Sequence, residues 1–432
     1  MKRPAVVTLL LLVSCGSATA TSSSELSEST EVSTPALTSL STPQTSPITV
    51  PSSSTLDPPI VDAEAAFPAK LALTTKDGQV VTFVPHDPPI VTPGVMDPTG
   101  KVVVSASAMG GRTMVEWHDV RTDGIFGTAL IDGDFRPTAV AQDGKLVALI
   151  GTTAQTTTVV LATPSRGEMR RWQFDAVLVP EAFANAFVPE GDGLPIGVFV
   201  IEYLAEHTYR VRVIDTATGE LGLPLNLRDK GQTVDEEMTA VSRTAVFEPV
   251  HQLLFTLYQD ATEDGENLGA FIHTLGLING VYCLDVPPEL GLADHPGGLA
   301  VSPDGSRLYA ASSSGGVAGY VVDDITNGSP EMPTARATAA LPASSSRVAI
   351  GASNNEVVVA FGGRLFRLDP VTLAVRDSFT WDMDIEALTV LDDGSIVIVG
   401  TGRMTLVSKH DNIQAEHILG DLAEVTRVAV VG

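Results

Sequence analysis

Histidine is the side chain most often used for proton transfer and metal binding near neutral pH, so its spacing is the first guide to chemistry. The chain has eight histidines: His86, His118, His207, His251, His273, His295, His410 and His417. None belongs to an H-E-x-x-H sequence or to a close pair, the spacings that place two imidazoles on one metal ion. We expect these histidines to be structural or surface residues, and the sequence predicts no metal site.

Motifs for cofactors and nucleophiles are missing as well. The sequence has no G-x-x-x-x-G-K-[ST] loop to hold a phosphate and no G-x-S-x-G turn to expose a serine. It has only two cysteines, so the Cys-x-x-Cys-His motif for covalent haem is absent. Local motifs therefore predict no cofactor and no catalytic residue.

Two acidic segments carry enough oxygen atoms to be considered for calcium, which takes roughly six to eight oxygen ligands. Asp260–Asn267 holds four acidic residues around Gly265, and Asp132-Gly133-Asp134 is shorter. Neither segment matches the calcium-loop pattern D-x-[DN]-x-[DN]-G. We interpret the first segment as a solvated loop between two strands.

The N-terminus carries the chain's clearest chemical signal, at Cys15. Lys2-Arg3 precede an apolar stretch from Ala5 to Val13, which is the pattern of a secretory signal and is too short to span a membrane. Its end, Leu12-Val13-Ser14-Cys15, resembles the bacterial lipobox. That resemblance implies that the Cys15 thiol receives a diacylglycerol and anchors the mature protein at the outer face of the bacterial cell membrane.

A second cleavage site competes with the lipobox. Ala18-Thr19-Ala20 is an A-x-A sequence that ordinary signal peptidase could cut, which would release a soluble protein. The other cysteine, Cys283, lies in the alternating segment Val281–Val286. We expect it to be a packed small hydrophobic residue, and once Cys15 is consumed no disulfide can form.

Composition divides the chain into three parts. Residues 1–14 are the signal peptide, residues 15–62 are rich in Ser, Thr and Pro, and residues 63–432 form the body. The middle part cannot bury enough apolar area to offset its ordering entropy, so we expect a disordered tether.

The chain is strongly acidic. Loss of Lys2 and Arg3 with the signal takes the formal net charge from −26 to −28. Such a surface would repel phosphates and the sequence shows no basic patch, so we expect no nucleic-acid partner. The acidic surface is interpreted as a means of solubility outside the cell.

A strand–turn–strand unit recurs throughout the body. Its clearest copy is Gly297–Ser312, in which a short apolar strand meets a Pro303-Asp304-Gly305 turn and a second alternating strand follows. Weaker copies begin near the following residues: Pro93, Pro137, Ala184, Arg243, Arg347, Glu386 and Thr426. Repeats of about 40 to 60 residues with several strands each are typical of β-propeller blades.

Further strands fill the intervals between copies, so that each unit contains strands a, b, c and d. In the unit near Ala184 we expect Tyr209–Ile214 and Glu220–Leu225 as strands c and d. In the unit near Arg347 we expect Arg364–Leu368 and Ala374–Phe379.

The two ends of the body are expected to share one blade. The last copy, at Thr426, offers only strand a, while Lys70–Thr75 and Gln79–Val84 are interpreted as a c–d hairpin. Pairing the first strands with the last would close the ring and remove its open edge. The count predicts an all-β propeller of eight four-stranded blades, with seven as the runner-up.

The segment Leu299–Ser312 resembles the strand–SPDG–strand signature of YVTN/WD40-like bacterial β-propellers, and the resemblance spans about residues 65–432. The chain departs from standard WD40 repeats, since no Trp-Asp dipeptide recurs from blade to blade to close them and no regular Gly-His pair occurs. The three tryptophans, Trp117, Trp172 and Trp381, are also too few for the regular docking series of quinone-binding propellers. The resemblance therefore supports a fold and not a function.

Two functions follow from these features. The first is a cell-envelope lipoprotein, expected to be a monomer, whose propeller is a binding or scaffolding module that contacts a protein or glycan partner through loops on one face. The alternative is an extracellular propeller hydrolase, similar to lactonases, whose site combines carboxylates and histidines from several blades near the central channel. Such a site is not visible in local motifs, so both functions remain open.

Overall fold

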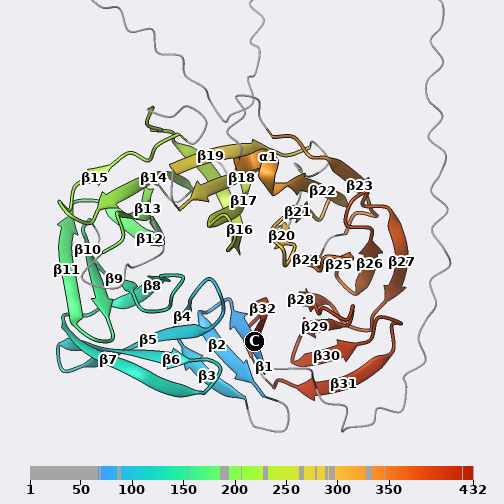
Figure 1. The fold of residues 1–432 in the computed structure, drawn as a ribbon, viewed down its shortest axis with the longest axis horizontal. Helices are drawn as coiled ribbons and strands as arrows, with labels where there is room; N and C mark the ends of the chain where they lie inside the picture. Colours follow the sequence, from blue (N-terminus) through green and yellow to red (C-terminus); the bar gives the residue numbers. More distant parts are fainter. Residues whose placement is uncertain are drawn as a thin grey trace, which may run out of the picture. The chain divides into compact units, whose positions relative to one another are not determined.

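The computed structural model describes residues 67, 70–84, 89–153, 155–184, 194–205, 207–226, 232–261, 267–277, 280–287, 290, 297–326, 333–344, 346–420 and 422–431. The predicted signal peptide, the predicted tether and Cys15 lie outside these residues. The described part is a ring of antiparallel sheets, and we number its blades 1 to 8 along the chain (Figure 1).

Each blade has four strands, of which the first in the order below lies innermost in the ring and the last outermost (Figure 1). Blades 1 to 3 consist of β4 (Val95–Met96), β5 (Val102–Met109), β6 (Arg112–Asp119) and β7 (Gly124–Asp132); β8 (Arg136–Val140), β9 (Val147–Thr152), β10 (Thr157–Thr163) and β11 (Gly167–Phe174); and β12 (Val177–Ala184), β13 (Gly197–Tyr203), β14 (Thr208–Asp215) and β15 (Leu221–Gly222). Blades 4 to 6 consist of β16 (Met238–Glu248), β17 (Leu253–Ala261), β18 (Asn267–Gly276) and β19 (Gly280–Asp285); β20 (Gly298–Val301), β21 (Arg307–Ala311), β22 (Gly316–Val321) and β23 (Ala337–Ala340); and β24 (Val348–Ala352), β25 (Val357–Phe361), β26 (Arg364–Leu368) and β27 (Val375–Thr380).

Blades 7 and 8 complete the ring. They consist of β28 (Ile385–Val390), β29 (Ile396–Gly400), β30 (Arg403–Val407) and β31 (Ile413–Ile418); and β32 (Val425–Val431), β1 (Lys70–Thr75), β2 (Gln79–Phe83) and β3 (Ile90–Pro93). A short helix, α1 (Val322–Thr326), follows β22. Six blades are separate four-stranded sheets, while β14 also pairs with β16 and so joins blades 3 and 4 into one sheet. Eight blades are confirmed, and seven is wrong.

The repeated turn joins the first two strands of a blade. In blade 5 the Gly305 N–H donates to the Ser302 carbonyl, and Gly305 has a φ of 72°, which favours glycine. The Asp304 carboxylate accepts hydrogen bonds from the Ser302 hydroxyl and the Ser306 N–H, and these bonds lower the pKa of Asp304. The same glycine-to-carbonyl bond recurs at Gly100, Gly144 and Gly394, which confirms the predicted repeat.

The ring closes in blade 8 by pairing β1 directly with β32, in a register that places Leu73 opposite Val428. The interpretation of 70–84 as a c–d hairpin is therefore wrong, because β1 and β2 are strands b and c. Strand d is β3, which pairs with β2. Pro89 and Pro93 hid this strand in the sequence, and an outermost strand tolerates proline because its outward N–H needs no partner in the sheet.

A second correction concerns blade 3. The first strand of the copy expected to begin near Ala184 ends at that residue, because the inner strand β12 covers Val177–Ala184. Pro180 lies in this strand beside a register shift, and a bulge is one of the places where a sheet accepts proline. The outer strand expected over Glu220–Leu225 shortens to Leu221–Gly222, whereas the strands expected over 364–368 and 374–379 are confirmed by β26 and β27.

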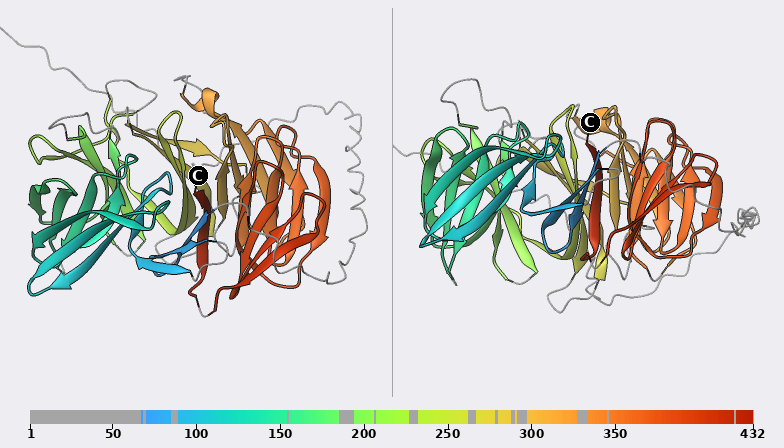
Figure 2. Two further views of the ribbon diagram at one scale, coloured as in Figure 1. Left: turned by 60° about the horizontal axis from the view of Figure 1, so that its bottom comes forward. Right: turned by 90° about the horizontal axis from the view of Figure 1, so that it is seen from below.

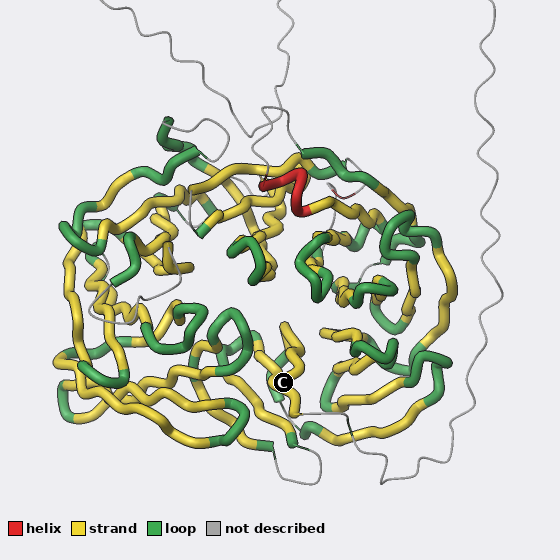
Figure 3. The backbone as a smooth tube through the Cα atoms, viewed as in Figure 1, coloured by secondary structure: helices red, strands yellow, loops and turns green. Residues whose placement is uncertain are grey.

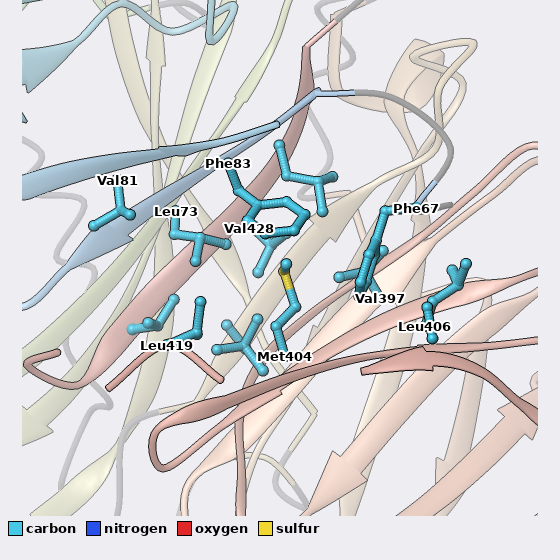
Figure 4. Close-up of a cluster of buried hydrophobic side chains, with 14 of the residues drawn as sticks. Phe67, Leu73, Val81, Phe83, Val397, Met404, Leu406, Leu419 and Val428 are labelled. Carbon is cyan, nitrogen blue, oxygen red and sulfur yellow. The ribbon is translucent and has the colours of Figure 1, made fainter. Parts of the chain in front are cut away.

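Apolar side chains fill the space between neighbouring blades. Figure 4 shows one such cluster, in which Phe83 of β2 packs edge-on against Phe67, at 5.2 Å between ring centroids. Leu73 and Val428 of blade 8 lie in the same cluster as Met404 of blade 7. Each fully buried side chain of this size contributes about 1.5–3 kcal/mol, so the blade interfaces hold the ring together.

The antiparallel order places the connections on two opposite faces of the ring, seen edge-on in Figure 2 and as loops in Figure 3. One face, here the b–c face, carries the turns between second and third strands and the connections from each blade to the next. The other, the a–b face, carries the repeated glycine turns and the turns between third and fourth strands.

Candidate functional site

Charged side chains gather where the inner strands of blades 6 to 8 begin, on the b–c face. We call Lys76, Arg347, Glu386 and Glu424 the closure network. Arg347 directly precedes β24 in blade 6, and its guanidinium forms a close ion pair with the Glu424 carboxylate, which precedes β32 in blade 8. This pair links two blades that are not neighbours, on either side of blade 7.

Blade 7 supplies the second carboxylate of the network. Glu386 of β28 accepts hydrogen bonds from the Val425 N–H at 2.9 Å and from the Thr401 hydroxyl at 3.2 Å. Burial lowers the pKa of Arg347, and the negative charge of Glu386 opposes that shift. The arginine nevertheless stays protonated at physiological pH, because its ordinary pKa lies far above it.

Lys76 connects the network to the first hairpin. Its side-chain ammonium lies 3.5 Å from the Glu424 carboxylate, and its backbone N–H donates to the Glu424 backbone carbonyl at 2.8 Å. Both carboxylates of the closure network are thus engaged by cations or hydrogen-bond donors. Such an arrangement stabilises ring closure and leaves neither carboxylate poised as a general base.

One further cation lies on an inner strand. Arg427 of β32 is exposed to solvent and donates a hydrogen bond to the Pro98 carbonyl at 3.1 Å. Although part of the Arg427 side chain is open to solvent, the protein atoms that crowd the inner edge of the ring lower its pKa, while the negative charge of Asp97 raises it. Within the described part of the chain no ion pair is formed by Arg427.

The structure does not bring together the histidines that lie within the described residues. His118 contacts Ser105 at 3.0 Å, His251 contacts the fully buried Glu248 at 3.0 Å, and His273 is buried in β18. His207 precedes β14, His410 follows β30 and His417 lies on β31, while His86 and His295 lie outside the described residues. No cluster of three or more metal-ligating side chains occurs among the residues that the structure describes.

The best-organised histidine is His251, on the a–b face. Its Nδ1 lies 3.0 Å from Glu248, and its Nε2 lies 3.5 Å from Asp323 of α1. Glu248 also accepts the N–H groups of Val250 and His251, so it performs in blade 4 the role that Asp304 performs in blade 5. The contact between Glu248 and His251 is thus part of a strand-connecting turn.

The two acidic segments lie where strands turn. Strand β17 ends at Ala261, one residue after Asp260, and β18 begins at Asn267, so this segment joins strands b and c of blade 4, as expected, although residues 262–266 lie outside the described residues. Asp132 ends β7, and Gly133 donates to the Gly111 carbonyl in the connection to blade 2. Cys283 is buried in β19 at 7% exposure, as expected of a packed residue.

Three large apolar side chains are exposed on the outer strand of blade 1. β7 exposes Ile125 at 52%, Phe126 at 48% and Leu130 at 39%. Blade 8 is the neighbour of blade 1 in the ring, and its outer strand β3 exposes Ile90 and Val91. Scattered exposed apolar residues are normal on a protein surface, whereas the three of β7 lie together on one outer strand.

Sequence reasoning missed both the closure network and β7. The network joins residues that are far apart in the chain and share no motif. The signal for β7 was present, because Gly124–Ile131 contains neither a charge nor a proline, but only its outermost position in the blade gives that run a meaning.

The membrane anchor stays a prediction, since Cys15 is outside the described residues. Within the part of the chain that the structure describes, no helix is long and apolar enough to cross a membrane.

No protein-family model matches the chain, and no curated protein matches it. Three solved structures are distantly similar to the chain. Sqt1 of Saccharomyces cerevisiae has a TM-score of 0.45 and 11% identity, over 76% of this chain and 85% of that chain. The uncharacterized protein lmo1340 from Listeria monocytogenes EGD-e has a TM-score of 0.41 and 9% identity, over 76% and 93%.

The third structure is dihydro-heme d1 dehydrogenase NirN in complex with DHE, with a TM-score of 0.45 and 12% identity, over 88% of this chain and 78% of that chain. Likenesses this distant carry no argument about function. By its own strand pairing, the chain is an eight-bladed β-propeller.

Proposed function

We propose that this chain is a cell-envelope lipoprotein of the YVTN/WD40-like type, whose propeller is a binding module that contacts a protein through its outer rim at blades 8 and 1. The supporting observation is the exposed apolar edge of β7, formed by Ile125, Phe126 and Leu130. The family is supported by the strand–turn–strand signature at Leu299–Ser312, and the anchor by the lipobox pattern at Cys15.

A protein partner fits this surface better than a glycan does. Sheet edges offer backbone N–H and C=O groups in a row, and another polypeptide strand can satisfy them while covering the apolar side chains. This contact differs from the loop-face contact expected from the sequence. It leaves both faces of the ring free for other contacts.

The anchor is tested by mass spectrometry of the mature N-terminus. We expect an acylated Cys15, because Leu12-Val13-Ser14-Cys15 resembles the lipobox. A mature chain that begins at Thr21 without lipid would contradict the anchor and leave the rim contact standing.

The rim contact is tested by photo-crosslinking in intact cells. A photo-reactive amino acid replaces Ile125 on β7, and the matched control replaces Gln173, which is exposed on the outer strand β11 of blade 2. We expect a defined protein adduct from position 125 and none from position 173. Equal yields at both positions, or no adduct at either, would overturn the proposal.

A further inference from the structure

The outer strands of the ring differ in how their free edges are protected. Sheet edges normally carry charges or prolines, are very short, or are covered by another segment. β11, β27 and β31 carry charged residues, β3 contains Pro93, and β15 and β23 are short. β19 is covered where the Val281 N–H donates to the Leu225 carbonyl.

β7 has none of these protections over most of its length. Its nine residues read Gly-Ile-Phe-Gly-Thr-Ala-Leu-Ile-Asp, with a single charge at the last position. It pairs only with β6, and the bulge in that pairing lies near Phe126 at one end of the strand. At the other end Arg171 of β11 donates to the Asp132 carbonyl, so the outward edge between these points has no partner among the described residues.

The two faces of β7 have different environments. Ala129 and Ile131 are buried in a cluster with Val147 and Leu149 of blade 2. Phe126, Thr128 and Leu130 alternate with them and are exposed. The exposed face and the free edge therefore meet along the same strand, and a new strand added there would cover both.

The sequence of β7 is complementary to itself in the antiparallel direction. If two copies of Gly124–Asp132 pair side by side and antiparallel over their full length, Thr128 lies opposite Thr128. Phe126 of each copy then lies opposite Leu130 of the other, once on each side of the two-fold axis. Directly opposed residues share one face of a sheet, so both Phe126–Leu130 pairs form on the exposed face. Aromatic–aliphatic and Thr–Thr pairs are favourable cross-strand contacts.

We infer that two copies of this chain associate through antiparallel pairing of their β7 strands, which joins the two blades 1 into one continuous sheet across a two-fold axis. This inference rests on the proposed function, since it names a second copy as the protein bound at the outer rim. It replaces the expectation of a monomer.

The register is tested by disulfide trapping in the full-length chain in its native membrane. Thr128→Cys places two thiols opposite each other across the axis, so mild oxidation should give a product of twice the mass. The control Gln173→Cys carries an equally exposed cysteine on β11, and the wild type reveals any product from Cys15 or Cys283. Dimer from Gln173→Cys at the same yield, or none from Thr128→Cys, would overturn the inference.

A second pair of variants keeps the test independent of that disulfide. Phe126→Lys and Leu130→Lys place a charge opposite an apolar residue in both symmetric pairs, and each should weaken association in sedimentation by about a hundredfold. A matched charge at an exposed site of another outer strand, Gln414→Lys on β31, should change nothing. Association that survives both β7 variants contradicts the inference.

Loss of self-pairing and loss of protein binding at the rim give different experimental results. A monomeric chain whose Ile125 crosslinks to a different protein refutes self-pairing and leaves the rim as a binding site. A monomeric chain with no adduct at Ile125 refutes both.

Discussion

β7 and β11 are the outer strands of neighbouring blades and have nearly the same length, yet their surfaces are opposite in character. β11 carries Glu168, Arg170 and Arg171, and two of these form an ion pair at 2.6 Å. β7 presents apolar side chains along the same outer edge. Because a free edge is prone to pair with other strands, the charges of β11 are a means of preventing association that β7 lacks.

The inner edge of the ring adds a second contrast. The charges of the closure network are matched by one another within the chain. The outer edge of blade 1 is the place where apolar area and backbone groups remain unmatched. Four predictions follow this contrast from the interior to the surface.

The largest effect is expected beneath β7. Trp117 of β6 is fully buried, whereas Trp172 of β11 is only half-buried and lies against Gly219. Trp117→Ala should lower the free energy of unfolding by about 3–5 kcal/mol. Trp172→Ala should cost about 1–2 kcal/mol, since less area is lost. Urea denaturation measures both.

A milder substitution serves as the control for this prediction. The indole N–H of Trp117 has no acceptor among the described residues, so Trp117→Phe should cost clearly less than Trp117→Ala. Equal losses for Trp117→Ala and Trp172→Ala would mean that the inner face of β7 is no better packed than that of β11.

The second prediction concerns His273, which is buried on β18 in the middle of blade 4. Burial lowers the pKa of His273 to about 4, below its ordinary value of 6.5. The neutral form is thus favoured in the folded state, and the stability it provides is complete above pH 6.5 and is lost as the pH falls toward 4. The loss should reach about 3 kcal/mol.

The measurement is the free energy of unfolding between pH 7 and pH 4 for the wild type and His273→Leu. The variant should lose less stability over this interval, because it has no buried imidazole to protonate. Parallel curves for the two proteins would contradict the assignment to His273.

An intermediate effect is expected at the inner edge. Glu424→Ala removes the carboxylate that Arg347 and Lys76 share, and it should lower stability by about 1–2 kcal/mol, since the network is partly exposed to solvent. The double variant with Arg347→Met should lose less than the sum of the single changes. Strict additivity would show that the two side chains do not interact.

The smallest effect on stability is expected at the outer edge itself. Phe126→Lys gives β7 a charge of the kind that β11 already has, and it should change the monomer's free energy of unfolding by about 0.5 kcal/mol or less. Thermal unfolding of the dilute protein measures this. A large loss would show that Phe126 supports the fold of blade 1 and would remove the basis for the comparison.

Much of the fold could be predicted because the first two strands of blades 1, 2, 5 and 7 are joined by the same kind of turn. In this turn a glycine N–H donates to the carbonyl three residues earlier, as Gly305 does to Ser302 and Gly100 does to Asp97. The errors lie where tertiary pairing tolerates residues that a local pattern excludes. Pro180 within β12 and Pro93 at the end of β3 are both of this kind.

The sites were less predictable than the fold. Arg347 and Glu424 meet only because blades 6 and 8 flank blade 7, which no local spacing encodes. The apolar run of β7 could be read in the sequence, but an identical run in a central strand would be ordinary core. Its exposure depends on the position of the strand in the blade.

The pairing of β1 with β32 also sets the order of events in folding. Thr426 donates its hydroxyl to the carbonyl of Thr74, a residue 352 positions earlier in the chain. Synthesis delivers β1 first, so this strand waits with an open edge until the last strand arrives. Such distant pairing makes closure slow, and a chain that stalls before residue 425 would expose β1 to any other strand it meets.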